Sequence, residues 1–258
     1  MIDPSSQNVI SFVGRHAIVD VHYHQCYQIV ASLDMPFNST INQVNYPGLN
    51  GFIVNQDIPH CCQAQDTEVL VYFIDPESAQ GRQLKEMLGD KPYIPVESIL
   101  GAGGLADIIR PYAPGSSVDE LRLIADDLLQ AIVPFDPEPE HRLFDERIEK
   151  VLDYIDDRLD EPMTLKDISS AVFLSPERIR HLFAKETGIS FSQYVLWKRI
   201  KLVLTEVIKD NVPMVDSAIQ NGFTDQAHFS RLFKRTFGVP AGQMLKNSRF
   251  VQFLTPEL

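Results

Sequence analysis

The feature that most constrains the fold is a pattern of two short helices joined by a tight turn, which occurs twice in the C-terminal part of the chain. In the first copy, Thr164 can cap a helix with Asp167 three residues later, which is a capping-box arrangement. After a short turn, Ser175 can cap a second helix with Pro176 at its first position, where the missing N–H costs nothing. The apolar residues of that second helix have the spacing of a core-facing stripe: Ile179, Leu182 and Phe183.

The second copy turns at Gly222-Phe223. Thr224 or Asp225 can cap its second helix, and Gly238 suits the C-terminal stop. Two sets of apolar residues are expected to be buried: Val215, Ala218 and Ile219 in the first helix, and Phe229, Leu232 and Phe233 in the second. The repeat predicts an all-α C-terminal domain with two helix-turn-helix motifs.

The outward faces of both second helices carry mostly polar or cationic side chains. These are Glu177, Arg178, Arg180, His181 and Lys185 in the first, and Gln226, Ala227, Ser230, Arg231, Lys234 and Arg235 in the second. An exposed helix with such donors, packed on another helix through a tight turn, fits the major groove of double-stranded DNA. The helix expected between the two copies rises ~1.5 Å per residue, which is long enough to hold two such units about one DNA turn apart.

Charge is distributed unevenly along the chain. The net charge of −12 at pH 7, taken alone, argues against a nucleic-acid partner. Residues 162–250, however, hold 13 Lys and Arg against 7 Asp and Glu, a balance of +6, so the remainder carries −18. Because phosphate contacts depend on the local surface, a basic C-terminal segment on an acidic body is compatible with DNA binding.

The N-terminal part predicts a small antiparallel β-barrel or sandwich followed by helices. Residues 9–75 contain β-branched and aromatic runs, such as HAIVDVHY and EVLVYFI, separated by turn-forming residues. Residues 76–133 become helical, and the prolines of the next segment hold the chain extended. We therefore expect an α+β protein with an N-terminal domain at 1–133, a Pro-rich linker at 134–141 and the tandem helix-turn-helix domain at 142–258.

The segments LSPERIRHLFAKETGISFSQYVLWKRI and GFTDQAHFSRLFKRTFGVP resemble the signature of the AraC/XylS family of transcription regulators. The resemblance covers roughly residues 145–247. It implies seven helices, with the third and sixth in adjacent major grooves, and RNA polymerase as a further partner. Carried over by register, base contacts would come from Glu177, Arg180, His181, Gln226, Ala227, Ser230 and Arg231, and phosphate contacts from Arg199, Lys234 and Arg235.

Two stretches depart from the family pattern. Gln220 and Asn221 stand where the family prefers small apolar residues, so they either weaken that helix or face solvent. After Pro240 the chain continues with AGQM instead of the more usual ending. Both departures concern the second helix-turn-helix unit.

The histidines His22 and His24, with Gln28 nearby and His60 further along, resemble the ligand motif of a cupin. In that motif an HxH pair, a carboxylate and a later histidine bind one divalent metal inside a β-barrel. We expect His22 and His24 to lie on one strand, where they project to the same face, and imidazole suits Fe, Ni, Cu or Zn. Gln28 stands where cupins usually hold a glutamate, which removes a negative ligand.

Three interpretations of this N-terminal constellation stay open: a divalent-metal site, a pocket for an organic effector, and a purely structural role. Cys61 or Cys62, next to His60, could supply a softer metal ligand. A divalent metal is the one cofactor that the sequence suggests, with His22, His24 and His60 as its ligands. The N-terminal domain is accordingly expected to act as a cupin-like sensor.

The segment SSVDELRLIADDLLQAI predicts an amphipathic helix. Helices after the cupin often form the dimer interface in the AraC/XylS family, so the resemblance favours a homodimer. Its seam would consist of Leu121, Ile124, Leu128 and Ile132. Leu121 and Leu128 lie seven residues apart, as a pairing seam requires. The same apolar face could instead cover the open end of the barrel.

Other classes of protein fit the sequence less well. No apolar run approaches the ~18 residues of a membrane span, and the N-terminus lacks the basic start and apolar core of a signal peptide. The chain has three cysteines, two of them adjacent, which suits a reduced cytoplasmic protein. We therefore expect a cytoplasmic protein.

Two rival functions remain beside DNA binding. The first is a cupin metalloenzyme with a helical appendage, against which Gln28 in the carboxylate position argues. The second is a module whose helix-turn-helix units contact RNA polymerase alone. The sequence favours a sequence-specific DNA-binding regulator that is not an enzyme and is controlled by a small molecule or metal in its N-terminal domain.

Overall fold

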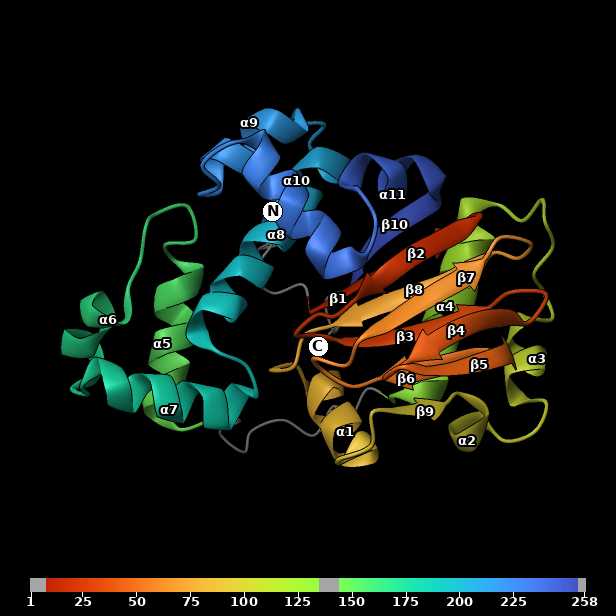
Figure 1. Cartoon of the computed structure of the whole chain (residues 1–258), viewed down its shortest axis with the longest axis horizontal. Helices are drawn as coiled ribbons and strands as arrows, with labels where there is room; N and C mark the ends of the chain where they lie inside the picture. The colour runs from red at the N-terminus through yellow and green to blue at the C-terminus, as the bar shows by residue number, and fades with distance from the viewer. Residues whose placement is uncertain (1–7, 135–143, 255–258) are drawn as a thin grey trace. The chain divides into compact units, whose positions relative to one another are not determined.

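The computed structural model describes residues 8–134 and 144–254, and most of the predicted linker at 134–141 lies outside this range. The described residues fall into two compact units (Figure 1). We call residues 8–134 together with 232–254 the β-unit, and residues 144–231 the helical unit. The division falls within one helix, α10 (Gln226–Phe237), so the C-terminal end of the chain belongs to the β-unit.

The β-unit contains two antiparallel sheets. The six-stranded sheet has the order β10 (Ser248–Leu254), β1 (Val9–Gly14), β8 (Val69–Ile74), β3 (Tyr27–Ser32), β6 (Gly51–Val54) and β9 (Tyr93–Pro95). The four-stranded sheet has the order β2 (Ala17–His22), β7 (His60–Ala64), β4 (Phe37–Ile41) and β5 (Val44–Leu49). Among the described residues no strand of one sheet pairs with a strand of the other, so the expected barrel is not closed.

Strand β10 was not expected, because the sequence predicted an all-α C-terminal domain. It pairs antiparallel with β1, from Val9 opposite Leu254 to Gly14 opposite Ser248 (Figure 1). The Arg249 side chain anchors this strand, because its guanidinium donates to the Glu68 carboxylate at 3.0 Å and also to the Ser116 carbonyl. Within the described part of the chain β10 pairs with β1 alone, and because β1 lies near the other end of the sequence, no local pattern predicts this strand.

The six-stranded sheet is buried on both faces, which explains the continuous apolar runs of its strands. Along β3, Tyr27 and Ile29 face a core built with the helices, while Gln28 and Val30 line the opposite face. Four helices follow β8 in the chain: α1 (Ala79–Leu88), α2 (Glu97–Leu100), α3 (Gly104–Ile109) and α4 (Val118–Ile132).

Helix α4 packs its apolar face on this sheet. Ser117 and Glu120 form a capping box at its start, and the Tyr72 hydroxyl donates to the Ala125 carbonyl at 2.6 Å. The residues predicted to form a dimer seam are at most 3 % exposed and belong to this core: Leu121, Ile124, Leu128 and Ile132. The seam prediction is therefore wrong for these residues, because covering a sheet and pairing with a second helix require the same apolar stripe.

The helical unit contains α5 (Glu146–Asp156), α6 (Leu165–Val172), α7 (Pro176–Thr187), α8 (Phe191–Lys209), α9 (Met214–Gln220) and the first half of α10. The caps of the first helix-turn-helix are confirmed. Thr164 and Asp167 form a capping box, Ser175 accepts from the Arg178 N–H, and Gly188 ends α7 with φ +81°. Ile179, Phe183 and Thr187 are buried, and Leu182 packs against the same core. The exposed residues of α7 include Glu177, Arg178, Arg180, His181 and Lys185.

In the second helix-turn-helix, Asp225 is the residue that caps α10, since its carboxylate accepts from the His228 N–H at 2.6 Å. Ala218 is buried as expected, whereas Val215 and Ile219 are exposed, so the predicted buried face of α9 is wrong at those two positions. Buried Asn221 takes the space instead, with its amide bonded to Glu206.

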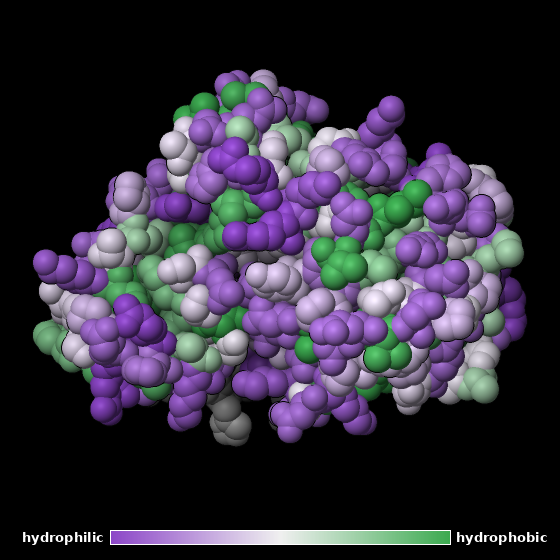
Figure 2. All heavy atoms as spheres, viewed as in Figure 1, coloured by the Kyte–Doolittle hydropathy of each residue, from purple (hydrophilic) through white to green (hydrophobic). Residues whose placement is uncertain are grey.

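Helix α11 (Ala241–Asn247) completes the described chain before β10. None of the described helices has an apolar stretch long enough to cross a membrane. Hydrophilic side chains dominate the face shown in Figure 2, with hydrophobic patches between them. The surface composition of this face therefore does not indicate a function by itself.

Candidate functional site

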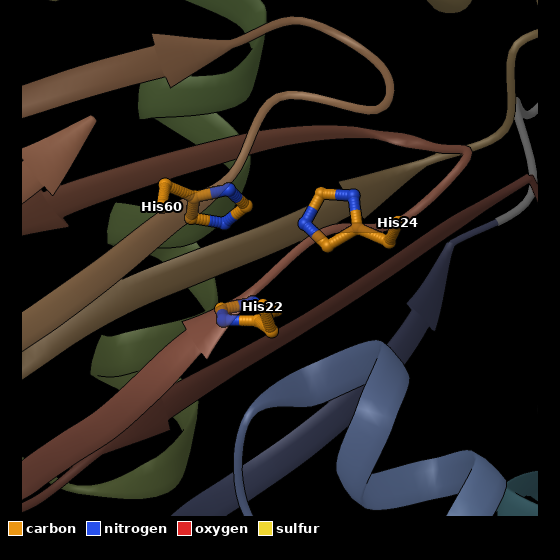
Figure 3. Close-up of side chains that lie close together, drawn as sticks. All are labelled: His22, His24 and His60. Atoms are coloured by element: carbon orange, nitrogen blue, oxygen red, sulfur yellow. The ribbon is translucent and has the colours of Figure 1, made fainter. Parts of the chain in front are cut away.

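Three buried imidazoles of the β-unit converge on one point (Figure 3). His22 is the last residue of β2, His60 is the first residue of β7, and the two are paired across the sheet. His24 lies just beyond β2, in the segment leading to β3, so the prediction that His22 and His24 share a strand is wrong. One ligand nitrogen from each ring lies within 4.8 Å of the other two. The structure thus brings together all three predicted metal ligands.

Each ring is oriented by a backbone carbonyl two residues away. The Nδ1–O distances are 2.9 Å from His22 to Asp20, 2.9 Å from His24 to Cys26, and 2.7 Å from His60 to Ile58. A carbonyl oxygen only accepts, so Nδ1 carries the proton in each ring and Nε2 keeps a free lone pair. This is the tautomer and the outer hydrogen bond found in metal-ligating histidines.

The Nε2 atoms of His22 and His24 are buried and have no hydrogen-bond partner among the described residues. Burial lowers the pKa of His22 to about 4 and that of His24 to about 3, the latter with a contribution from the neighbouring His22. Burial and both neighbouring rings also hold the pKa of His60 well below its ordinary value. The rings are therefore neutral at physiological pH, which is the form that ligates a metal.

Gln28 approaches the triad from β3. Its carboxamide oxygen lies 2.7 Å from Nε2 of His60, and its side chain is buried. Because Nε2 of His60 is an acceptor, either the amide turns so that its NH₂ donates, or the two acceptors share a cation. Orphaned lone pairs on two rings, a matching tautomer on the third and a carboxamide oxygen fit a divalent metal.

The cysteines considered as softer ligands lie outside the triad. Among the described residues the cluster contains His22, His24 and His60 alone, without a thiol or a carboxylate. Cys61 accepts from the Thr40 N–H at 3.4 Å, and burial raises the pKa of Cys62 to about 12. A thiol so reluctant to ionise is a poor metal ligand.

A cavity of about 70 Å³ opens onto the triad. His22, Gln28 and His60 belong to its lining. Most of the other lining residues are apolar and come from the six-stranded sheet, the four-stranded sheet and the C-terminal segment: Phe12, Val30, Val71 and Phe73, then Ile18 and Val19, then Phe237 and Met244. The site is therefore reachable by a small, largely apolar molecule.

The end of α10 packs directly on the histidine cluster. The Asp20 N–H donates to the Gly238 carbonyl at 3.3 Å, while the Asp20 carbonyl accepts from His22. Lys234 forms a 3.2 Å ion pair with the Asp20 carboxylate. Gly238 has φ +72°, and a Cβ there would lie 2.8 Å from His22 Nδ1. Glycine is thus required both by the backbone and by the close approach to the ring.

The predicted DNA-contacting residues of α7 and α10 are exposed. On α7 these are Glu177, Arg178, Arg180, His181 and Lys185, and on α10 they are Gln226, Ala227, Ser230, Arg231, Lys234 and Arg235. Arg180 donates to Glu177 at 2.6 Å, so these two side chains share one surface ion pair. Exposure on a second helix of a helix-turn-helix is the arrangement that groove reading requires.

Arg199, predicted to bind phosphate, also supports the helical unit. Its guanidinium donates to the carbonyls of Leu159 at 2.8 Å and Glu161 at 2.6 Å, with a longer contact to Gly222 at 3.4 Å. The side chain is half-buried, and three of its five N–H donors are used inside the helical unit. Arg199 therefore braces the turn of the second helix-turn-helix, and its contact with phosphate stays a prediction.

Comparison with known proteins agrees with this geometry. Residues 168–247 match the model of a helix-turn-helix domain family. The multiple antibiotic resistance protein MarA of Escherichia coli is 32 % identical over 93 residues, which is 36 % of this chain and 73 % of MarA. This chain belongs to the AraC/XylS family of transcription regulators. Its AraC/XylS membership makes it a DNA-binding regulator and not an enzyme.

A further relative is the probable transcriptional regulator LumQ of Photobacterium leiognathi, 34 % identical over 103 residues, covering 38 % of this chain and 42 % of LumQ. The fold of the whole chain is similar to that of ToxT from Vibrio cholerae, with a TM-score of 0.54 and 14 % identity over 93 % of this chain and 96 % of ToxT. A second ToxT structure, with a TM-score of 0.53 and 15 % identity over 93 % of this chain and 95 % of ToxT, contains an unsaturated fatty acid. At this identity the likeness concerns the fold.

Proposed function

We propose that this regulator reads specific double-stranded DNA through α7 and α10 and that a divalent metal held by His22, His24 and His60 controls it. The observation that carries the metal assignment is the pair of buried Nε2 atoms without partners on His22 and His24. Leaving such acceptors unsatisfied costs about 1–3 kcal/mol each. A metal ion satisfies both at once, and at a rigid site it also holds β2 to β7.

The DNA assignment rests on exposure and charge. We assign base contacts to Glu177, Arg180 and His181 of α7 and to Gln226, Ala227, Ser230 and Arg231 of α10, all of which are exposed. We assign supporting contacts to Arg178, Lys185, Lys234 and Arg235, whose cationic heads are also exposed. Arg and Gln side chains are suited to guanine and adenine edges, respectively.

Control by the metal is supported by the contacts at the end of α10. Asp20 connects the histidine triad to the end of α10. Its carbonyl accepts from the His22 ring, its N–H donates to the Gly238 carbonyl, and its carboxylate pairs with Lys234. A metal that fixes His22 therefore also fixes the strand end on which α10 terminates. Ligand binding shifts an equilibrium only where it contacts two states differently, and this junction supplies such a contact.

A small organic effector is the second candidate for the controlling ligand. The observation in its favour is the apolar cavity next to the triad. The fatty acid in a ToxT structure is compatible with an effector in this part of the fold. The two candidates are not exclusive, since the cavity and the triad adjoin.

Homodimerisation and contact with RNA polymerase remain proposals for this regulator, which would act in the cytoplasm. The core residues of α4 are not free for a dimer. Val118 and Leu123 are the exposed large apolar side chains of α4, at 41 % and 65 %. We propose this outer side of α4 in place of the seam predicted from the sequence.

The DNA assignment is tested by measuring specific and non-specific DNA affinity of Arg180→Ala and Arg231→Ala. Each should lose about 1–3 kcal/mol of sequence-dependent affinity. Arg122→Ala, an exposed arginine on α4, is the matched control and should bind as the wild type does. Undiminished specific binding by both variants would remove α7 and α10 as the reading elements.

A further inference from the structure

The proposed metal site has no negative charge of its own. Its three imidazoles are neutral because each Nδ1 already donates its single proton to a carbonyl. Gln28 adds a neutral carboxamide. Among the described residues the cluster contains no carboxylate. A divalent cation bound here keeps its full charge of two in a buried position.

The charged groups near the site do not compensate such an ion. Asp20 lies closest along β2, but its carboxylate is exposed and pairs with Lys234 at 3.2 Å. Arg15 lines the outer part of the cavity, and its guanidinium pairs with Glu68 at 2.6 Å. Burying an uncompensated charge is costly, so a bound metal attracts an anion from outside the chain.

The cavity determines what kind of anion reaches the metal. The anion would bind beside His22, Gln28 and His60, and most of the other lining residues are apolar, Val30 and Val71 among them. An inorganic anion would leave those apolar walls against water. An anion with an apolar tail fills them and gains about 0.8 kcal/mol per buried methylene, which is roughly a fourfold gain in affinity.

The volume sets the length of the tail. The cavity of about 70 Å³ has room for roughly five to seven non-hydrogen atoms, at ~10–15 Å³ for each water-sized position. A carboxylate of about four or five carbons has this size. A long-chain fatty acid exceeds it several times over.

We propose, on the basis of the proposed metal site, that the metal and the adjoining cavity together bind a short-chain aliphatic carboxylate. The carboxylate supplies the negative ligand that Gln28 does not. The hydrocarbon tail lies among the apolar side chains of the two sheets and the C-terminal segment. The regulator therefore senses the carboxylate only when the metal is present.

The test is a titration of the Co²⁺-loaded full-length protein, followed by its visible absorption spectrum. Butyrate is the main probe, with acetate, octanoate and inorganic phosphate for comparison. Butyrate should change the cobalt bands saturably and bind at least tenfold more tightly than acetate, since two methylenes each add about fourfold. The metal-free protein should bind no butyrate by calorimetry.

Two variants sharpen the result. Gln28→Glu places a carboxylate in the site, so it should bind Co²⁺ more tightly and butyrate at least tenfold more weakly than the wild type. Gln63→Glu adds the same charge on an exposed position of β7 and is the matched control. Val71→Phe narrows the cavity, so it should keep Co²⁺ and acetate but lose butyrate.

The outcomes separate the two levels of the proposal. A wild-type protein that takes up no Co²⁺ overturns the metal site and this inference with it. A protein that binds Co²⁺ but whose spectrum no carboxylate changes overturns the carboxylate inference alone. So does a response to phosphate equal to that to butyrate, or undiminished butyrate binding by Gln28→Glu.

Discussion

At the scale of single residues, the histidine triad illustrates how backbone carbonyls choose a tautomer. Nδ1 of each ring donates a hydrogen bond to a carbonyl two residues away. The neighbouring backbone, and not a distant side chain, therefore sets the direction in which Nε2 points. The sequence could identify His22, His24 and His60 from their spacing. It could not show that two of their Nε2 atoms lack any partner, because that depends on packing across both sheets.

Replacing one ring separates a metal site from a structural histidine cluster. His24→Ala should weaken Zn²⁺ or Co²⁺ binding at least tenfold, measured by competition with a chromophoric chelator. The metal-free protein should lose stability as well, because the substitution removes a buried ring and its Nδ1 hydrogen bond to the Cys26 carbonyl, so metal binding and not stability is the readout.

His16→Ala is the control for this substitution. His16 is exposed and bonds the Gln65 carbonyl, away from the triad. Its loss should leave metal binding unchanged. If the wild-type protein binds neither Zn²⁺ nor Co²⁺, or if His24→Ala binds them as tightly as the wild type does, the metal assignment fails.

At the scale of elements, local and long-range signals explain which parts were predictable. The caps at Thr164, Ser175 and Gly188 act within a few residues, so the sequence located α6 and α7 well. The bracing role of Arg199 was missed because its carbonyl partners Leu159 and Glu161 come from a preceding loop about forty residues away. A cationic side chain on a helix gives no local sign of whether it faces DNA or its own backbone.

Strand β10 depends on a pair of charges that are 181 residues apart, Glu68 and Arg249. Burial alone would raise the pKa of Glu68, but hydrogen bonds from Arg249, Tyr112 and Arg15 outweigh it and lower the pKa. A carboxylate whose pKa is lower in the folded than in the unfolded state stabilises the fold above its unfolded pKa of ~4.3 and loses that effect as pH falls.

We therefore predict that β10 loosens in acid. Amide hydrogen exchange of residues 248–254 should quicken as pH falls through the folded-state pKa of Glu68, once the intrinsic pH dependence of exchange is subtracted. Glu68→Gln should show the faster exchange already at neutral pH, since a neutral amide pairs less strongly with Arg249. Equal protection of β10 in both proteins at neutral pH would contradict this role of Glu68.

At the scale of the whole molecule, the family and the two-part organisation followed from the sequence, whereas the boundary between the parts did not. The chain end that was assigned to the DNA-binding domain joins the β-unit from Leu232 onward. The amphipathic pattern of α4 was equally compatible with a dimer seam and with a sheet cover. Periodicity shows that an apolar face is buried but not against what.

Helix α10 links signal to target in the proposed function. Its exposed start carries Gln226 and Ser230, and its end rests on Asp20 beside His22. A metal bound by the triad would therefore act on α10 through Asp20 and through the Phe73 ring, which contacts both His24 and Phe237. Coupling free energies between sites are typically about 1–3 kcal/mol, or roughly 5–150-fold in affinity.

The central claim is tested most directly by the affinity of the full-length protein for an operator selected from random DNA, measured with Zn²⁺ and after chelation. We predict that the wild-type affinity differs about tenfold or more between the two conditions, and that His24→Ala shows the metal-free affinity in both. Equal wild-type affinity with and without metal, in protein shown to bind the metal, would contradict it.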